Sequence, residues 1–135
     1  MSGWDQYCLG MKFTWPFVFG EEKMKTFSAL SGDYHPIHLE KSFARSKGFD
    51  APIIYGLLLS SQISKLIGEE LPDEHALLTG IKMDFLHPCL VNDSLIFHAE
   101  LVAKSDATLF LEFKCKILNG EITSCRGTAS AIWRP

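Results

Sequence analysis

The segment Ser31-Gly32-Asp33-Tyr34-His35-Pro36-Ile37-His38 places one carboxylate and two imidazoles within six residues. Because a proline fixes the turn, Asp33 and His38 are expected to converge on one small volume. A carboxylate and an imidazole that face each other can hold one water molecule and move protons to and from it. The neighbouring aromatic residues are expected to bury the two groups. The segment therefore predicts an acid–base pair.

Two other interpretations of this segment stay open. A solvated turn tolerates such polar density, with Asp33 capping the helix that follows. The second interpretation is a metal site, because Asp33, His35 and His38 are three potential ligands. Their spacing matches no established zinc motif, however, and no fourth ligand is evident, so we expect no metal.

A second candidate feature is the apolar run Ala51-Pro52-Ile53-Ile54-Tyr55-Gly56-Leu57. Gly56 falls in the first turn of a predicted helix, where main-chain N–H groups lack helical acceptors and the helix dipole is positive. A buried N–H of this kind can donate to a carbonyl oxygen on which negative charge develops. Alternatively, Gly56 only permits a helix and a strand to pack closely, and a glycine alone does not decide between the two.

The helix that begins there is predicted from Tyr55 to Glu70. Its three consecutive leucines, 57–59, point in three directions, so its first turns should be buried on nearly every side. Pro72 marks its end. Small residues alternate on the inner face of the last predicted strand (Cys125, Gly127, Ala129 and Ala131). They would let this helix lie close to the sheet.

Residues 76–133 alternate between apolar and polar side chains, which predicts half-buried strands. The pair Asn119-Gly120 is a strong hairpin signal, and the last four strands are expected to form an antiparallel meander. The segment Met11–Phe19 predicts a further strand, placed at an edge because Pro16 lacks a ladder donor. The predicted fold class is α+β: a single domain over residues 1–135, with a curved antiparallel sheet wrapped around a long central helix.

Composition narrows the function classes. The 135 residues are 47% hydrophobic and 21% charged with a net charge of −3, which suits a globular domain and argues against a nucleic-acid binder. No signal-peptide pattern is present, and the longest uncharged apolar stretch, 51–59, is about half of what a bilayer crossing needs. The four cysteines form no Cys-x-x-Cys pair, which favours free thiols in the cytoplasm.

Taken together, these residues resemble a known family. Ser-Gly-Asp-x-x-Pro-Ile-His followed by Pro-Ile-x-x-Gly-Leu-Leu looks like the MaoC-like (R)-specific enoyl-CoA hydratases and dehydratases, which have the hot-dog fold. Phe85-Leu86-His87-Pro88 with Val91-Asn92-Asp93 also resembles that family, and the resemblance runs from Leu9 to the last strand. The family usually has Asn at His35, His at Tyr55 and Gly at Asn92.

The resemblance implies a reaction and a site. The reaction is reversible hydration of an enoyl thioester to a (R)-3-hydroxyacyl thioester, carried on coenzyme A or an acyl carrier protein, with no cofactor. It implies that Asp33 and His38 are catalytic and that the Gly56 amide polarises the thioester carbonyl. The residues expected to contact substrate are His35, Tyr55, Leu57, Ser64 and Phe85.

Further expectations concern partners. Lys41, Arg45 and Lys47 could meet the phosphates of the carrier, or they are simply solvated. The open sheet edge predicts a homodimer, as in hot-dog proteins of this family, and the terminal aromatic residues Trp4, Tyr7 and Trp133 are expected to help form it. Two other functions stay open: a hot-dog thioesterase with Asp33 as base, and a non-catalytic acyl-thioester binder or dimerisation module.

Overall fold

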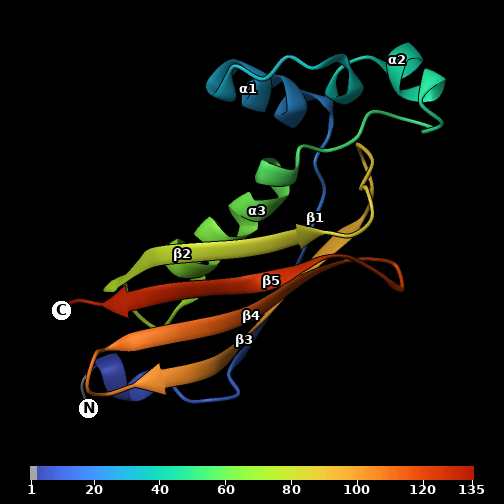
Figure 1. Ribbon diagram of the computed structural model, residues 1–135. Helices are drawn as coiled ribbons and strands as arrows, with labels where there is room; N and C mark the ends of the chain where they lie inside the picture. Colours follow the sequence, from blue (N-terminus) through green and yellow to red (C-terminus); the bar gives the residue numbers. More distant parts are fainter. Residues whose placement is uncertain (1–2) are drawn as a thin grey trace.

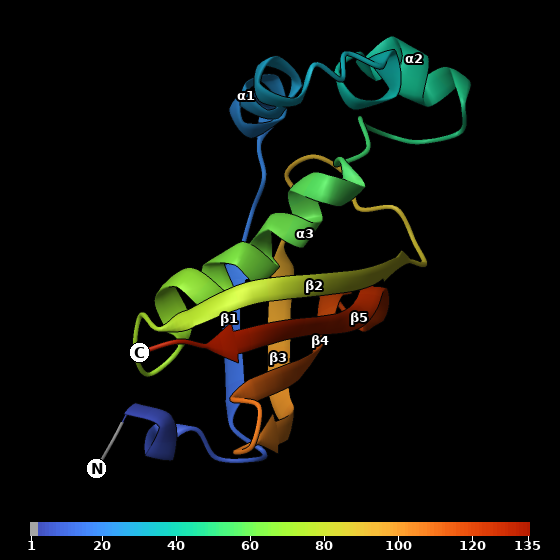
Figure 2. The same ribbon diagram turned by 60° about the vertical axis from the view of Figure 1, so that its left-hand side comes forward.

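The computed structural model describes residues 3–135 as a five-stranded antiparallel sheet with a long helix against one face (Figures 1 and 2). The strands are β1 (Lys12–Phe17), β2 (Ala76–Phe85), β3 (Leu95–Ser105), β4 (Phe110–Asn119) and β5 (Ile122–Trp133). The helices are α1 (Glu21–Ser31), α2 (Lys41–Ser46) and α3 (Gly56–Lys65), with short 3₁₀ turns at Gly3–Gln6 and Pro36–His38. A π-helical turn, Leu66–Glu70, continues α3. The predicted class, a curved antiparallel sheet around a central helix, is confirmed.

The strand order is β1-β3-β4-β5-β2. β1 lies at one edge, as Pro16 predicts. The meander is confirmed only for β3, β4 and β5. The expectation that β2 is its first strand is wrong, because β2 pairs with β5 at the opposite edge. The connection between β2 and β3 spans residues 86–94, too long for a tight hairpin, so the chain crosses over the end of the sheet instead.

The β4–β5 hairpin forms where predicted, with its turn shifted by one residue. Asn119 pairs with Ile122, so the two loop residues are Gly120 and Glu121. Gly120 has φ of 62°, whereas Asn119 is not in the left-handed region. A glycine at the first loop position suits the hairpin turn that requires positive φ there alone.

Burial follows the predicted alternation on the first two strands of the meander. Leu95, Phe97, Ala99 and Leu101 of β3 are buried, and so are Leu111, Phe113, Cys115 and Ile117 of β4. β2 differs: Ile81 is 47% exposed and Phe85 50%. Leu57, in the first turn of α3, is 73% exposed, so the prediction that this turn is buried on nearly every side is wrong for the single chain.

The terminal aromatic residues pack within the chain. Trp4, Tyr7 and Trp133 are all nearly fully buried. The Tyr7 hydroxyl donates to Asp73 Oδ1 at 2.8 Å, and Trp133 Nε1 donates to the same carboxylate, with 2.9 Å to Oδ2. The expectation that these aromatic residues help to form a dimer interface is therefore wrong, because their own chain covers them.

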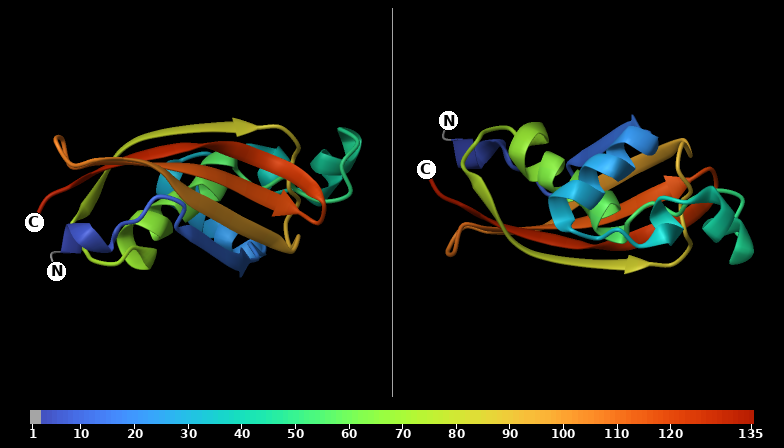
Figure 3. Two further views of the ribbon diagram at one scale, coloured as in Figure 1. Left: turned by 90° about the horizontal axis from the view of Figure 1, so that it is seen from below. Right: turned by 90° about the horizontal axis from the view of Figure 1, so that it is seen from above.

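α1 and α2 lie together beyond one end of the sheet, near the start of α3, while the turn Gly3–Gln6 and the end of β5 lie at the other end (Figures 1 and 3). The segment before α3 is held by main-chain bonds: Ile54 N donates to Cys89 O at 2.8 Å, and Val91 N donates to Pro52 O at 2.9 Å. These bonds place the first turn of α3 beside the loop that follows β2. The polar segment 31–38 joins α1 to α2 above this point.

Candidate active site

The loop that carries Asp33 is ordered by its own side chains. The Asp33 amide donates to Ser31 Oγ at 3.1 Å, and Asp33 Oδ1 accepts a hydrogen bond from the His35 amide at 3.0 Å. His35 Nδ1 in turn accepts from the Ile37 amide at 3.0 Å, capping the 3₁₀ turn that ends at His38. Asp33 Oδ1 thus closes an Asx turn onto the His35 amide, and the expectation that Asp33 caps the following helix is wrong, because His35 holds the cap position. Among the hydrogen bonds of residues 3–135, none uses Asp33 Oδ2.

The hydrogen bond of His38 defines its tautomer. Its Nδ1 lies 2.6 Å from the main-chain oxygen of Ile53. Because a carbonyl oxygen only accepts, Nδ1 carries the proton and donates it. In the neutral imidazole, Nε2 then has the free lone pair. This is the form that a general base needs.

Tyr55 contacts the segments of both Asp33 and His38. Its hydroxyl donates to the main-chain oxygen of Asp33 at 2.7 Å. Its ring stacks on the His38 ring with centroids 3.9 Å apart and an interplanar angle of 24°. Burial and, after it, the negative charge of Asp33 raise the pKa of the Tyr55 phenol, so Tyr55 stays a protonated donor.

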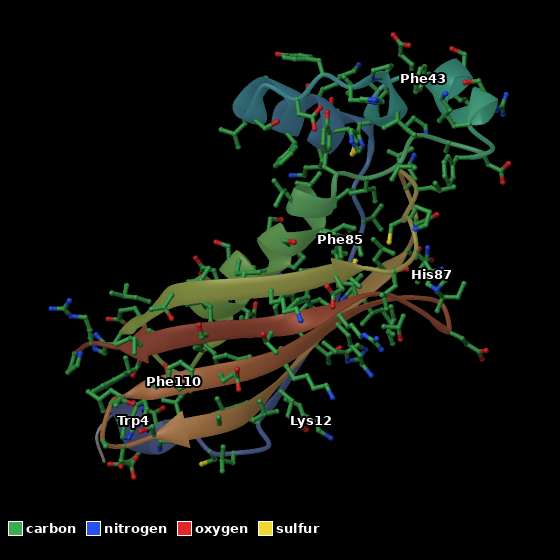
Figure 4. All side chains as sticks on the ribbon, in the orientation of Figure 1. Trp4, Lys12, Phe43, Phe85, His87 and Phe110 are labelled. Atoms are coloured by element: carbon green, nitrogen blue, oxygen red, sulfur yellow. The ribbon has the colours of Figure 1, made fainter. Side chains whose placement is uncertain are left out.

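A cavity of about 400 Å³ opens beside His38. Three of the predicted site residues line it: His38 from the 3₁₀ turn, Gly56 from α3 and Phe85 from β2. Its other walls are mainly apolar: Phe49, Ile53, Ile54, Leu59, His87, Pro88 and Cys89. Figure 4 shows Phe85 at the end of β2 near the start of α3, and His87 in the loop beyond. The Gly56 N–H, in the first turn of α3, has no helical acceptor.

The structure leaves five predicted residues outside this cavity wall, and Asp33 is one of them. Leu57 and Ser64 lie on the exposed side of α3, and His35 is exposed with its Nδ1 already bonded. Tyr55 is buried behind His38 instead of lining the cavity. The expected burial of the acid–base pair is wrong for Asp33, which is exposed in the single chain, while His38 is half-buried.

Sequence reasoning missed several lining residues. Phe49, His87 and Cys89 are brought in by the pairing of the segments around Ile53 and Leu90. His87 stands within the motif Phe-Leu-His-Pro quoted above, which is the one signal that pointed to it. Cys89 and Cys125 are buried together, and the hydrogen bond that the Cys125 thiol donates lowers the pKa of Cys89.

Two further observations concern residues 3–135. No group of three His, Cys, Asp or Glu side chains in this range is arranged to hold a metal ion. None of the helices formed by these residues has the length and apolar character needed to cross a membrane.

Comparison with known proteins gives the family. The sequence model of the MaoC-like domain matches residues 8–123. The chain belongs to the MaoC-like domain family. Both halves of the candidate site, the loop 31–38 and the start of α3, lie within the matched range.

Individual relatives agree with this assignment. The (R)-specific enoyl-CoA hydratase of Aeromonas caviae is 36% identical over 85 residues, and the alignment spans 63% of each protein, just under two thirds of that relative. The mitochondrial 3-hydroxyacyl-[acyl-carrier-protein] dehydratase of Arabidopsis thaliana is 26% identical over 119 residues, 85% of this chain and 70% of the other. The solved (R)-hydratase from A. caviae superposes with a TM-score of 0.90 at 29% identity, over 95% of this MaoC-like chain and 98% of that one.

Proposed function

We propose that this MaoC-like protein is a hydro-lyase that adds water reversibly to the 2,3 double bond of an enoyl thioester, forming a (R)-3-hydroxyacyl thioester. The observation that carries the proposal is the cavity that His38 and Gly56 line together. The similar hydratase and dehydratase named above act on such thioesters, which supports the same substrate class here.

The proposed chemistry divides between three groups. His38 Nε2 and Asp33 Oδ2 bind one water molecule, and they take a proton from it as its oxygen bonds to C3. The electron pair of the double bond moves toward the thioester carbonyl. Asp33 and His38 then return a proton to C2. The Gly56 N–H donates to the carbonyl oxygen as negative charge develops there, a contact worth about a hundred-fold or more in rate. Only water and thioester are consumed, so the reaction needs no cofactor.

We propose further that the active form is a homodimer. Asp33 is open to solvent in the single chain, whereas catalysis of this kind benefits from exclusion of bulk water. Large apolar side chains are exposed along β2 and the start of α3, namely Leu57, Leu77, Leu78, Ile81 and Phe85. β2 is also an edge strand with free main-chain groups. A second copy that pairs there would cover this surface.

For the carrier, we propose that phosphate groups contact the exposed cations of α2 and the residue after it, Lys41, Arg45 and Lys47. Replacing all three by alanine should raise KM for a coenzyme A thioester and leave KM for the N-acetylcysteamine thioester, which has no phosphate, unchanged. Lys12, Lys114 and Lys116 are exposed on the sheet, and replacing them removes the same charge as a control. Equal effects of both triple variants would contradict the contact.

A cytoplasmic location stays a prediction.

The deciding experiment follows the ultraviolet absorbance of short and medium enoyl-CoA substrates, with the wild type beside Asp33→Asn. Loss of enoyl absorbance with formation of (R)-3-hydroxyacyl-CoA is expected from the wild type alone. Release of free thiol in place of hydroxyacyl product would indicate a thioesterase. Binding without turnover at any chain length would indicate a non-catalytic module. Full activity of Asp33→Asn would refute the assigned pair.

A further inference from the structure

The buried side chain of Tyr55 joins three parts of the candidate site. Only 2% of its surface is exposed. The hydroxyl holds the main chain at Asp33 (2.7 Å), and the ring stacks on His38 (3.9 Å between centroids). Its own main-chain oxygen accepts the hydrogen bond of Leu59 N at 3.0 Å, which starts α3 one residue before Gly56. A displacement of Tyr55 would therefore move the carboxylate loop, the imidazole and the helix start together.

The Tyr55 ring is also fixed from behind. Phe27 of α1 packs against it with centroids 4.6 Å apart. The Nδ1 bond of His38 to Ile53 anchors the other side of the stack. The Tyr55 ring thus contacts both a ring of α1 and the imidazole of His38, with its hydroxyl on the loop of Asp33. Such a side chain has few alternative rotamers, since the space around it is filled.

We propose that Tyr55 is the positioning residue of this site, and that it sets the separation of Asp33 and His38 without touching substrate. This inference rests on the proposed function, and it replaces the expected contact of Tyr55 with substrate. Two observations favour the new role. Tyr55 is absent from the cavity wall, and its hydroxyl is already engaged by a main-chain oxygen. A donor used in this way fixes geometry and has no proton to give to the reaction.

The test is a pair of substitutions. Tyr55→Phe keeps the stack on His38 and removes the bond to Asp33. We expect kcat to fall about five-fold, as loss of one neutral hydrogen bond implies, with KM within about two-fold of the wild type. Tyr55→Leu also removes the stack, and kcat should fall about a hundred-fold. Tyr34→Phe is the matched control, since Tyr34 lies next to Asp33 but is 63% exposed; its kcat should not change.

A second readout is independent of turnover. The ring current of Tyr55 shifts the NMR resonances of the His38 ring protons, so these resonances should stay in place in Tyr55→Phe and move in Tyr55→Leu. A thermal melt identifies a variant that fails to fold; if Tyr55→Leu does, Tyr55→Phe still decides the question. Unchanged kcat in Tyr55→Phe, or a raised KM with unchanged kcat, would overturn the positioning role.

The two proposals fail differently. If the wild type turns over no enoyl thioester, the proposed function is wrong, whereas the NMR comparison still reports whether Tyr55 fixes His38. If the wild type is active and Asp33→Asn is inactive, but Tyr55→Phe matches the wild type in kcat and KM, the function stands and the positioning role is refuted.

Discussion

His38 Nδ1 donates a hydrogen bond of 2.6 Å to the main-chain oxygen of Ile53, three residues before Gly56. The bond couples the orientation of the proposed base to the start of α3, whose Gly56 lines the same cavity as His38. It also assigns the free lone pair to Nε2. The structural and chemical functions of the imidazole therefore belong to different nitrogens, and substitutions can separate them.

The first prediction uses this separation. In His38→Asn, the amide nitrogen can still donate to Ile53 O, but nothing replaces Nε2. We expect kcat to fall by about 10²–10⁴, the range for loss of a general base, while the melting temperature changes by only a few degrees. In His38→Ala both are lost, so the melting temperature should fall as well. Steady-state kinetics and calorimetry measure the two effects. Retention of a tenth or more of the activity in His38→Asn would contradict the role of Nε2.

The second prediction concerns the space in front of Gly56. A Cβ atom at this position would lie 3.0–3.1 Å from the Phe85 ring, closer than side chains normally pack. In Gly56→Ala the ring must move into the cavity or the amide must shift, so kcat/KM should fall about ten-fold or more. Phe85→Leu removes the ring and should restore much of the loss in the double variant. A double-mutant cycle on kcat/KM measures this coupling, and strictly additive losses would exclude the contact.

The sequence predicted the parts of the fold that depend on neighbouring residues. Alternation fixed the buried faces of β3 and β4 because each has water on one side and core on the other. It failed for β2, where Ile81 and Phe85 are exposed although their pattern predicts an inner face. The single chain does not supply the surface that would cover them. The position of β2 beside β5 was also missed, because strand pairing across a long connection depends on contacts remote in the sequence.

The same division holds for the site. Asp33, His38 and Gly56 are predicted from the sequence because each lies in a short segment whose residue types already indicate chemistry, and the structure brings His38 and Gly56 to one cavity. Cys89 has no such local signal, and only the bridge between Ile53 and Leu90 brings it to the cavity wall. The resemblance places Ser64 in the pocket, whereas in the structure it lies two turns beyond Gly56 on the exposed side of α3. Which side of α3 faces the cavity depends on how the helix packs against the rest of the fold, and local sequence does not determine that.

The third prediction tests the proposed dimer. Ile81 lies mid-strand on β2 and is 47% exposed, so Ile81→Lys would place a charge in the centre of an interface formed there. We expect this variant to sediment as a monomer, to stay folded and to lose most of its activity as Asp33 opens to solvent. Lys82→Ala, next to it on the opposite face, is the control and should remain dimeric. A fully active dimer of Ile81→Lys would show that the copies associate elsewhere.

The fourth prediction is a pH dependence of stability at the other end of the sheet. Burial first, and then the hydrogen bond to Asp73 and its charge, raise the pKa of Tyr7 well above the ordinary value of 10.0. Above pH 10 the unfolded chain loses this proton while the folded chain retains it. The free energy of unfolding must therefore fall as the pH rises past 10. Tyr7→Phe cannot ionise in either state, so this part of the alkaline loss should be absent.

Urea unfolding at neutral pH and at pH values above 10 tests this. At neutral pH, Tyr7→Phe should be less stable by about 1–2 kcal/mol, because Asp73 loses one hydrogen-bond donor. As the pH rises, the difference in the free energy of unfolding between the wild type and Tyr7→Phe should shrink and then change sign. The reason is that only the wild type has the Tyr7 hydroxyl, whose ionisation in the unfolded chain lowers stability. Tyr34→Phe is the control, because it removes an exposed tyrosine. Its free energy of unfolding should fall with rising pH as steeply as that of the wild type. A constant gap between Tyr7→Phe and wild type at all pH values would mean that the Tyr7 hydroxyl ionises alike in the folded and unfolded chains.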